Sequence, residues 1–233
     1  MTHKMISTPQ INNLSNPFES HAAEYDDWFD SERGSQIFSI ELDALKKVVD
    51  TENRHWLEVG VGSGRFAVAL GVESGVDPSS EMVRLSSERG VNTCQASGEQ
   101  LPFGDSWFDG VILVCTICFI DDPDSVIKEC RRVLKDDGQL VIGFVPANSI
   151  WGIYHSLRGK RGHAFYSSAH FYTSEDLRAL VCSTGFTFRN EYGCVLPSPN
   201  EISVSDVMSE QSIRNESFMI LSFFKTNNKG VKL

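Results

Sequence analysis

The most distinctive pattern in the chain is a short apolar run that ends in three closely spaced glycines. Residues 55–59 are apolar at most positions and match the length of a buried strand. Gly60, Gly62 and Gly64 follow, and residues 66–70 then carry apolar side chains at helical spacing. Glycine has no Cβ, and the first turn of a helix has unpaired N–H groups. We therefore expect a strand, a glycine loop and a helix, with a ligand lying against the loop backbone.

Apolar runs and helical stripes alternate as far as residue 145. Strands are expected to end near Asp77 and to cover residues 91–96, 109–115 and 139–145. Helices are expected over residues 79–89 and from Asp122 to a stop at Gly138. The continuous apolar run at 109–115 is typical of a strand buried on both faces. This alternation predicts an α/β fold with a doubly wound, mostly parallel sheet that binds its ligand at the carboxyl ends of the strands.

The region before the first strand has a different character. Residues 1–16 form a polar lead-in, and helical character with several aromatic residues runs from Phe18 to Phe29. Gly34 is expected to break this helix before a second apolar stripe at helical spacing begins at Ile37. We interpret residues 1–50 as a flexible lead followed by a helical cap, and residues 51–233 as the main domain.

The pattern changes again after Pro146. Residues 147–172 hold many aromatic and basic side chains and are too irregular for one helix. A capping box at Thr173 predicts a helix through Val181. Two final strands are expected at residues 186–192 and 218–224, with a polar surface loop between them at 197–214. Residues 226–233 are expected to form a frayed tail.

Composition narrows the classes of function. A chain of 233 residues can bury the core of one α/β domain. The net charge of −10 argues against a nucleic-acid partner, which needs a basic surface. No apolar run reaches the length of a membrane span, and the N-terminus lacks the apolar core of a signal peptide. Six scattered cysteines fit reduced thiols, so we expect a cytoplasmic protein without a membrane partner.

The residues around the glycines indicate which ligand is bound. A dinucleotide fingerprint would place a third glycine at position 65, where this chain has Arg65, and this disfavours a nicotinamide-dependent oxidoreductase. Glu58 precedes the first glycine; a carboxylate there opposes a diphosphate but suits an ammonium group. Asp77 follows Gly60 by 17 positions and can accept both hydroxyls of a ribose. These residues predict a nucleoside with a cationic tail.

Four motifs then occur in order, at residues 57–64, 75–79, 97–103 and 107–111. Together they resemble the class I S-adenosylmethionine-dependent methyltransferases of small-molecule type, similar to those of ubiquinone and menaquinone biosynthesis. The resemblance extends over roughly residues 55–145. It implies S-adenosyl-L-methionine as cofactor and a Rossmann-like fold, with an N-terminal helical cap and a C-terminal antiparallel hairpin.

The resemblance also implies a set of cofactor-binding residues. Ser97 stands where many relatives have an aspartate, and the backbone N–H of Gly98 is expected to read the adenine instead. The cofactor-binding residues implied are Glu58, Gly60, Gly62, Gly64, Asp77, Pro78, Ser97, Gly98, Glu99, Cys115 and Thr116.

The cap and residues 147–172 are expected to form a lid over a small-molecule acceptor, which could be an amine, a thiol or a phenol or quinol. The expected acceptor contacts are Tyr25, Trp28, Cys118, Tyr154, Phe165 and Tyr166. Aromatic walls favour a cationic sulfonium or amine.

The catalytic requirements depend on the acceptor. In-line methyl transfer to a neutral amine, thiol or phenolate needs no strong base, and the sequence assigns no firm catalytic residue. For other acceptors Tyr25, His163 and His170 are candidate proton acceptors. Cys115 and Cys118 form one Cys-x-x-Cys pair without a second, so no metal site is expected. A cofactor-binding regulatory or scaffold protein without turnover stays a possible alternative, and the sequence leaves the oligomeric state open.

Overall fold

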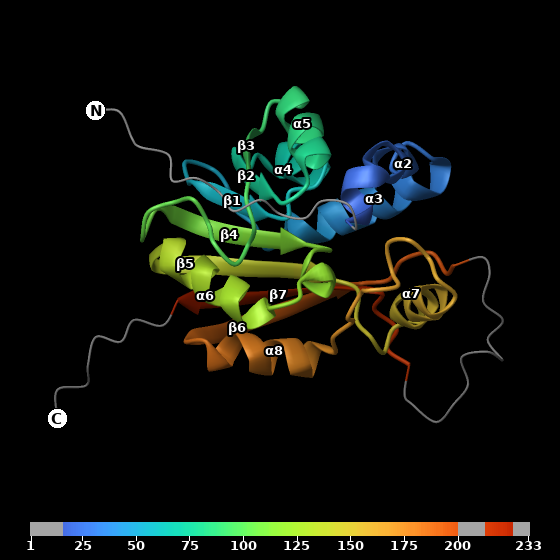
Figure 1. Cartoon of the computed structure of the whole chain (residues 1–233). Helices are drawn as coiled ribbons and strands as arrows, with labels where there is room; N and C mark the ends of the chain where they lie inside the picture. The colour runs from blue at the N-terminus through green and yellow to red at the C-terminus, as the bar shows by residue number, and fades with distance from the viewer. Residues whose placement is uncertain (1–15, 200–212, 226–233) are drawn as a thin grey trace.

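A computed structural model describes residues 16–199 and 213–225 of the chain. These residues form one seven-stranded sheet with the strand order β3-β2-β1-β4-β5-β7-β6 (Figure 1). The strands are β1 (Trp56–Val59), β2 (Ser74–Asp77), β3 (Asn92–Gln95), β4 (Phe108–Val114), β5 (Leu134–Phe144), β6 (Phe186–Cys194) and β7 (Phe218–Lys225). The polar lead-in, most of the loop expected at 197–214 and the tail at 226–233 lie outside the described residues.

The sheet is parallel from β3 to β5, and β7 runs antiparallel between β5 and β6. This arrangement confirms the predicted Rossmann-like fold with its C-terminal antiparallel hairpin. The helices are α1 (Pro17–Ser20), α2 (Ala22–Trp28), α3 (Glu32–Leu45), α4 (Arg65–Leu70), α5 (Ser80–Glu88), α6 (Pro123–Val133), α7 (Ile150–Lys160) and α8 (Ser174–Ser183).

Two apolar cores, one on each face of the sheet, hold the layers together. One contains Ile127 and Leu177 from α6 and α8, and the other contains Ile37 and Phe66 from α3 and α4. In Figure 1, α2, α3 and α7 gather at the side to which the carboxyl end of β4 points. Two segments lie outside the central αβ repeats: the cap and the aromatic region after residue 146. The topology brings both to the carboxyl ends of the parallel strands, where ligands bind in this type of fold.

Two expected helix stops are wrong. Gly34 lies inside the first turn of α3, where its N–H donates to the Oγ of Ser31, which caps the helix. A Cβ at position 34 would lie 1.9 Å from the carbonyl oxygen of Trp28, so the glycine permits close packing and does not end a helix. The break before α3 falls at residues 29–31 instead, and His21 separately divides the expected first helix into α1 and α2.

The helix after Pro123 ends at Val133, five residues before Gly138, the expected stop. The carbonyl oxygens of Arg132 and Val133 accept hydrogen bonds from the N–H groups of Ser106 and Trp107. These bonds give the last carbonyl groups of α6 hydrogen-bond partners outside the helix, and β5 begins at the next residue, Leu134. Among the described residues, no helix has the length and apolarity needed to cross a bilayer.

Candidate cofactor and acceptor site

The glycine loop is held in place by Asp77 at the end of the neighbouring strand. Its Oδ2 accepts the N–H of Gly62 at 2.9 Å, and its Oδ1 accepts the N–H of Ser79 at 2.9 Å. A Cβ at Gly60 would lie 2.2 Å from the Thr116 methyl group, so only glycine fits there. A Cβ at Gly62 would meet only Cε1 of Tyr25, at 4.0 Å. The backbone at Gly62 is therefore open toward the cap.

Two buried carboxyl groups lie beside this loop. Glu58 is 2% exposed and accepts the N–H of Ala67, but its Oε2 has no partner within the described part of the chain. Burial, with the charge of Asp77 second, raises the pKa of Glu58 well above its usual value. Burial also raises the pKa of Asp77 to about 6, against the effect of its bonds to Ser79 and Gly62. The unpaired Oε2 of Glu58 fits a ligand's ammonium group, and the carboxylate of Asp77, which has lone pairs to spare, fits ribose hydroxyls.

The other expected cofactor residues lie at the carboxyl ends of β2, β3 and β4. Pro78 accepts a hydrogen bond from the side chain of Gln95 through its carbonyl oxygen. Ser97 pairs through its hydroxyl with the carboxylate of Glu99. Thr116 donates its hydroxyl to the carbonyl oxygens of Gly60 and Val114, at 3.2 and 3.0 Å. Gly98 packs tightly, because a Cβ there would lie 3.1 Å from Val126.

The cap is fixed to the glycine loop by a network of charges. Asp26 on α2 binds Nε of Arg65 at 2.7 Å and the guanidinium of Arg89 at 2.5 Å. Arg65 also binds Asp30 at 2.8 Å, and Arg89 donates to the carbonyl oxygen of Ser63 at 2.7 Å. Burial alone would raise the pKa of Asp26, but hydrogen bonds from Arg65, Ser63 and Arg89 lower it to about 2. We call Asp26, Arg65 and Arg89 the cap clamp.

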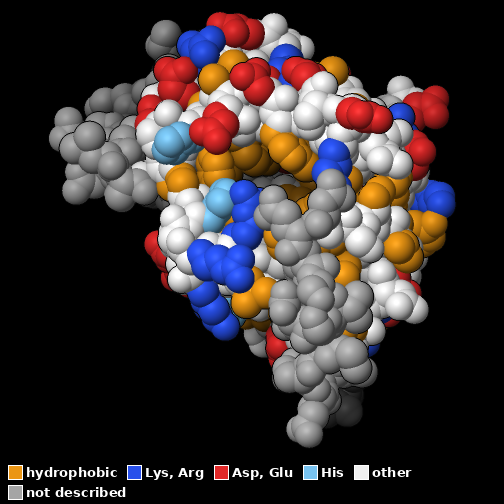
Figure 2. Space-filling view, turned by 90° about the vertical axis from the view of Figure 1, so that its right-hand side faces the viewer, with side chains coloured by type: hydrophobic (Ala, Val, Ile, Leu, Met, Phe, Trp, Pro, Cys, Tyr) orange, Lys and Arg blue, Asp and Glu red, His pale blue; other side chains and the backbone are white. Residues whose placement is uncertain are grey.

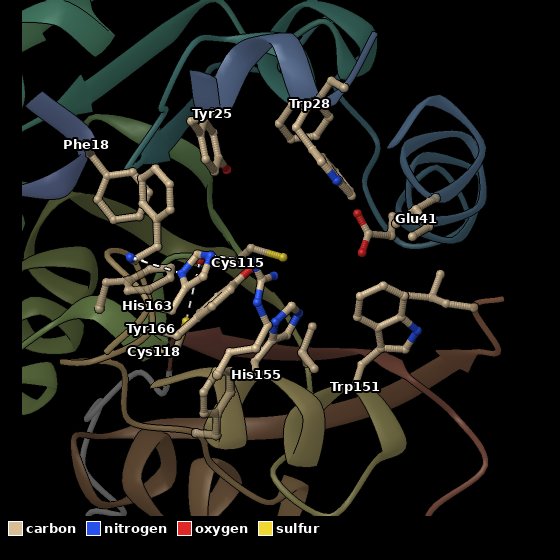
Figure 3. Close-up of a pocket in the computed structure, with 18 of the residues that line it drawn as sticks. Phe18, Tyr25, Trp28, Glu41, Cys115, Cys118, Trp151, His155, His163 and Tyr166 are labelled. Carbon is tan, nitrogen blue, oxygen red and sulfur yellow. Dashed lines mark hydrogen bonds between the residues drawn. The ribbon is translucent and has the colours of Figure 1, made fainter. Parts of the chain in front are cut away.

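A cavity of about 450 Å³ lies between the cap and α7. Its walls come from α1, α2, α3, the end of β4 and residues 150–171, and aromatic side chains dominate them (Figure 3). Figure 2 shows the apolar floor of this hollow, with acidic side chains along one side of the opening and basic ones on the opposite side. The expected acceptor contacts Tyr25, Trp28, Cys118, Phe165 and Tyr166 line the cavity. Tyr154 does not; its ring packs behind, against Trp151 at 5.7 Å between ring centres.

Comparisons with known proteins agree with this geometry. The family model described as a methyltransferase domain matches residues 57–142. A crystal structure from Thermotoga maritima, described as an S-adenosylmethionine-dependent methyltransferase and possible histamine N-methyltransferase, is 30% identical, with a TM-score of 0.78. The match covers 90% of this chain and 98% of that one. The chain belongs to the S-adenosylmethionine-dependent methyltransferases. The family implies S-adenosyl-L-methionine as cofactor.

Two curated relatives show how far the similarity extends. An uncharacterized protein of Mycobacterium tuberculosis is 42% identical over 165 residues, which are 71% of this chain. The match covers only 58% of that relative's length. The ubiquinone/menaquinone biosynthesis C-methyltransferase of Geotalea daltonii is 31% identical over 114 residues, 42% of this chain and 48% of that protein. These matches support the class I resemblance.

The candidate proton acceptors of the methyltransferase differ in placement. His163 lines the cavity, but its Nε2 contacts the guanidinium of Arg158 and its Nδ1 accepts the N–H of Phe165 at 3.3 Å. Burial and then the charge of Arg158 lower its pKa. His170 is exposed, lies outside the cavity lining and packs on Tyr172. Both histidines lie within the aromatic segment 147–172, so their sequence positions do not show that His163 lines the cavity and His170 does not.

Tyr25 and the two thiols are neutral in this environment. Burial raises the pKa of Tyr25 and of Cys115 well above their usual values, and that of Cys118 to about 12. The thiol of Cys118 donates to the carbonyl oxygen of Cys115 at 3.7 Å. Within the described ranges, no group of three or more potential ligand side chains could hold a metal ion. These thiols therefore act as apolar lining and not as thiolates.

Three further polar residues line the cavity, and sequence reasoning missed two of them, Arg158 and Glu41. Arg158 lies over the rings of Tyr154 and Tyr166, at 5.4 and 5.5 Å. His155 is buried, its pKa is lowered to about 3 by burial, and its Nδ1 has no partner among the residues described. Glu41 is a carboxyl group on the buried face of α3. The signal for Glu41 was in the sequence, because it follows Ile37 by one helical turn on an apolar stripe.

Proposed function

We propose that this protein transfers the methyl group of S-adenosylmethionine to a small-molecule acceptor held in the aromatic cavity. The observation that carries the proposal is the continuity of the cavity with the glycine loop. Tyr25 lines the cavity and is also the nearest side chain to the open backbone at Gly62. Cys115 lines the cavity as well and directly precedes Thr116, which is bonded to Gly60.

The residues around the loop have the chemistry that this cofactor needs. Oε2 of Glu58 offers a buried acceptor to the ammonium group, and Asp77 offers its carboxylate to the ribose hydroxyls. The bound sulfonium supplies an already activated methyl group. The protein then has to align the acceptor and exclude water, and a cavity with aromatic walls favours both. The net charge of −10 supports a small molecule and not a nucleic acid as acceptor.

Calorimetric titration tests the cofactor assignment. S-adenosylmethionine and NADH are titrated into the wild type, Asp77→Ala and the control Asp43→Ala, which removes an exposed carboxylate from α3. We expect S-adenosylmethionine alone to bind, with affinity lost in Asp77→Ala and kept in the control. Binding of NADH, or no binding by the folded wild type, would refute the proposal.

Release of S-adenosylhomocysteine tests turnover. The assay is run with amines, thiols and quinol-like phenols as acceptors. Product formation with any of these classes supports a methyltransferase. Cofactor binding without turnover on all of them would favour the regulatory or scaffold alternative.

A further inference from the structure

The feature of the cavity that the proposed function leaves unused is the carboxyl group of Glu41. Its residue is 6% exposed, and the rest of the buried face of α3 is apolar. Figure 3 shows the carboxyl group pointing into the cavity, between Trp28 and Trp151. No residue in the described ranges gives it a hydrogen bond or an ion pair.

The groups around Glu41 do not neutralise it. It interacts with Tyr25 on α2, Cys115 after β4 and Cys194 on β6, and burial keeps all three uncharged at neutral pH. Glu24 and Asp27 on α2 also line the cavity, but as acids they bring no positive charge to it. Arg33, two turns earlier on α3, lies over Trp151 and donates to the carbonyl oxygen of Ser198. Burial is the sole cause that raises the pKa of Glu41, to about 8.

On the other side of the cavity, α7 contributes His155 and Arg158. His155 is uncharged, and the guanidinium of Arg158 is engaged with the ring of His163 and two tyrosine rings. Across residues 16–199 and 213–225, therefore, no neighbour supports the ionisation of this buried acid.

A structural role does not explain this residue. A buried carboxyl group without a partner costs free energy, and a leucine would pack better at the same helical position. The cost is recovered when a donor or a cation enters the cavity, and the indole rings beside the carboxyl group attract cations as well. An anionic acceptor would instead face repulsion at this end of the cavity.

We propose that Glu41 selects the acceptor, and that the acceptor carries a basic amine which pairs with the Glu41 carboxylate between Trp28 and Trp151. The inference rests on the proposed function, because it names the class of molecule that the same cavity receives. It makes Glu41 a specificity-determining residue for substrate binding.

The test compares two probes of equal shape, phenethylamine and phenethyl alcohol. Their binding is measured by calorimetry at pH 7, with the free protein and with the S-adenosylhomocysteine complex. We expect the amine to bind more tightly than the alcohol. Since a carboxyl group with a pKa of about 8 is mostly protonated at pH 7, pairing with the ammonium should release most of one proton. Repeating the titration in buffers of different ionisation heat measures this release.

Two variants make the test specific. Glu41→Gln keeps the size of the side chain, and we expect it to weaken amine binding at least about 30-fold, to remove the proton release and to leave alcohol binding unchanged. Glu32→Gln makes the same change at an exposed position of the same helix and should behave as the wild type. Glu41→Leu should raise the Tm, because it removes an unpaired buried acid, and should also lose the preference for the amine.

Three results would overturn the inference. They are equal binding of the two probes to the wild type, an unchanged amine preference in Glu41→Gln, and a loss of S-adenosylmethionine affinity in Glu41→Gln as large as the loss for the amine. The last would assign the carboxylate to the cofactor's own ammonium group. Failure of the wild type to bind S-adenosylmethionine would refute the proposed function separately, because the amine is also titrated into the free protein.

Discussion

The cap clamp allows a quantitative prediction about stability. In Asp26→Asn the side chain keeps its size but loses the charge that Arg65 and Arg89 share. The side chain of Asp26 is only 12% exposed, so solvent screens these pairs weakly. The fall of its pKa from 3.8 to about 2 corresponds to about 2 kcal/mol of stability at neutral pH. The variant should therefore unfold at a Tm about 4 to 8 °C lower than the wild type.

The pH dependence gives this prediction its sign. A lowered pKa in the folded state stabilises the protein above the pKa of the unfolded state, and this contribution is lost as the pH falls. The difference between wild type and Asp26→Asn should thus be constant from pH 7 to pH 5 and shrink from about pH 4 toward pH 2. Thermal and urea denaturation at several pH values measure it.

Asp30→Asn is the matched control for the clamp. Asp30 also pairs with Arg65, but its side chain is 69% exposed, so solvent screens this pair and it contributes little to stability. A loss in Asp26→Asn no greater than the loss in Asp30→Asn would refute the reasoning that burial gives the clamp its strength.

Three further predictions concern the glycine loop, Asp77 and the thiols. Gly64→Ala should lower the free energy of unfolding by about 2 kcal/mol in chemical denaturation, because the φ of Gly64 is +84° and a Cβ there would lie 2.9 Å from the Cβ of Ser86. Gly104→Ala, where a Cβ would meet no atom within 4 Å, should leave the free energy of unfolding unchanged. Burial raises the pKa of Asp77 to about 6, so the affinity for S-adenosylmethionine, measured by calorimetry, should fall as the pH drops from 7 to 5. Asp77→Asn should bind more weakly than the wild type, with an affinity that does not change over this pH range. Thiol titration should show a single fast cysteine, the exposed Cys182, and Cys182→Ser should remove that phase.

The sheet and the glycine loop were predictable because their signals are local. The strand at Trp56–Val59, the glycines after it and the acid at Asp77 lie within about 20 residues of one another. The three glycines restrict the backbone locally, since Gly60, Gly62 and Gly64 all adopt a positive φ that other residues rarely tolerate. A fold that repeats strand and helix in this way leaves few alternative topologies.

The cap clamp and the polar side of the cavity were not predictable in the same way. Asp26 meets Arg89 across 63 positions of sequence, and neither residue belongs to a motif. Arg65 was interpreted only as a missing glycine, although it binds the cap. The false stop at Gly34 has a different origin. The carbonyl oxygen that requires a glycine there belongs to Trp28, at the end of α2, and a glycine required by close packing looks the same in a sequence as one that ends a helix.

The buried acids of the site connect its stability to its function. Glu41, Glu58 and Asp77 all have pKa values raised by burial, and no positive side chain of the described structure pairs with them. Since a raised pKa stabilises the folded state only at low pH, each of these groups destabilises the free protein as the pH rises through its folded pKa. A core selected for stability alone would not keep them. Two of these carboxyl groups lie beside the glycine loop and the third points into the cavity. Ligands that bring an ammonium group, ribose hydroxyls and a basic amine would therefore stabilise the protein at positions where its own buried acids destabilise it.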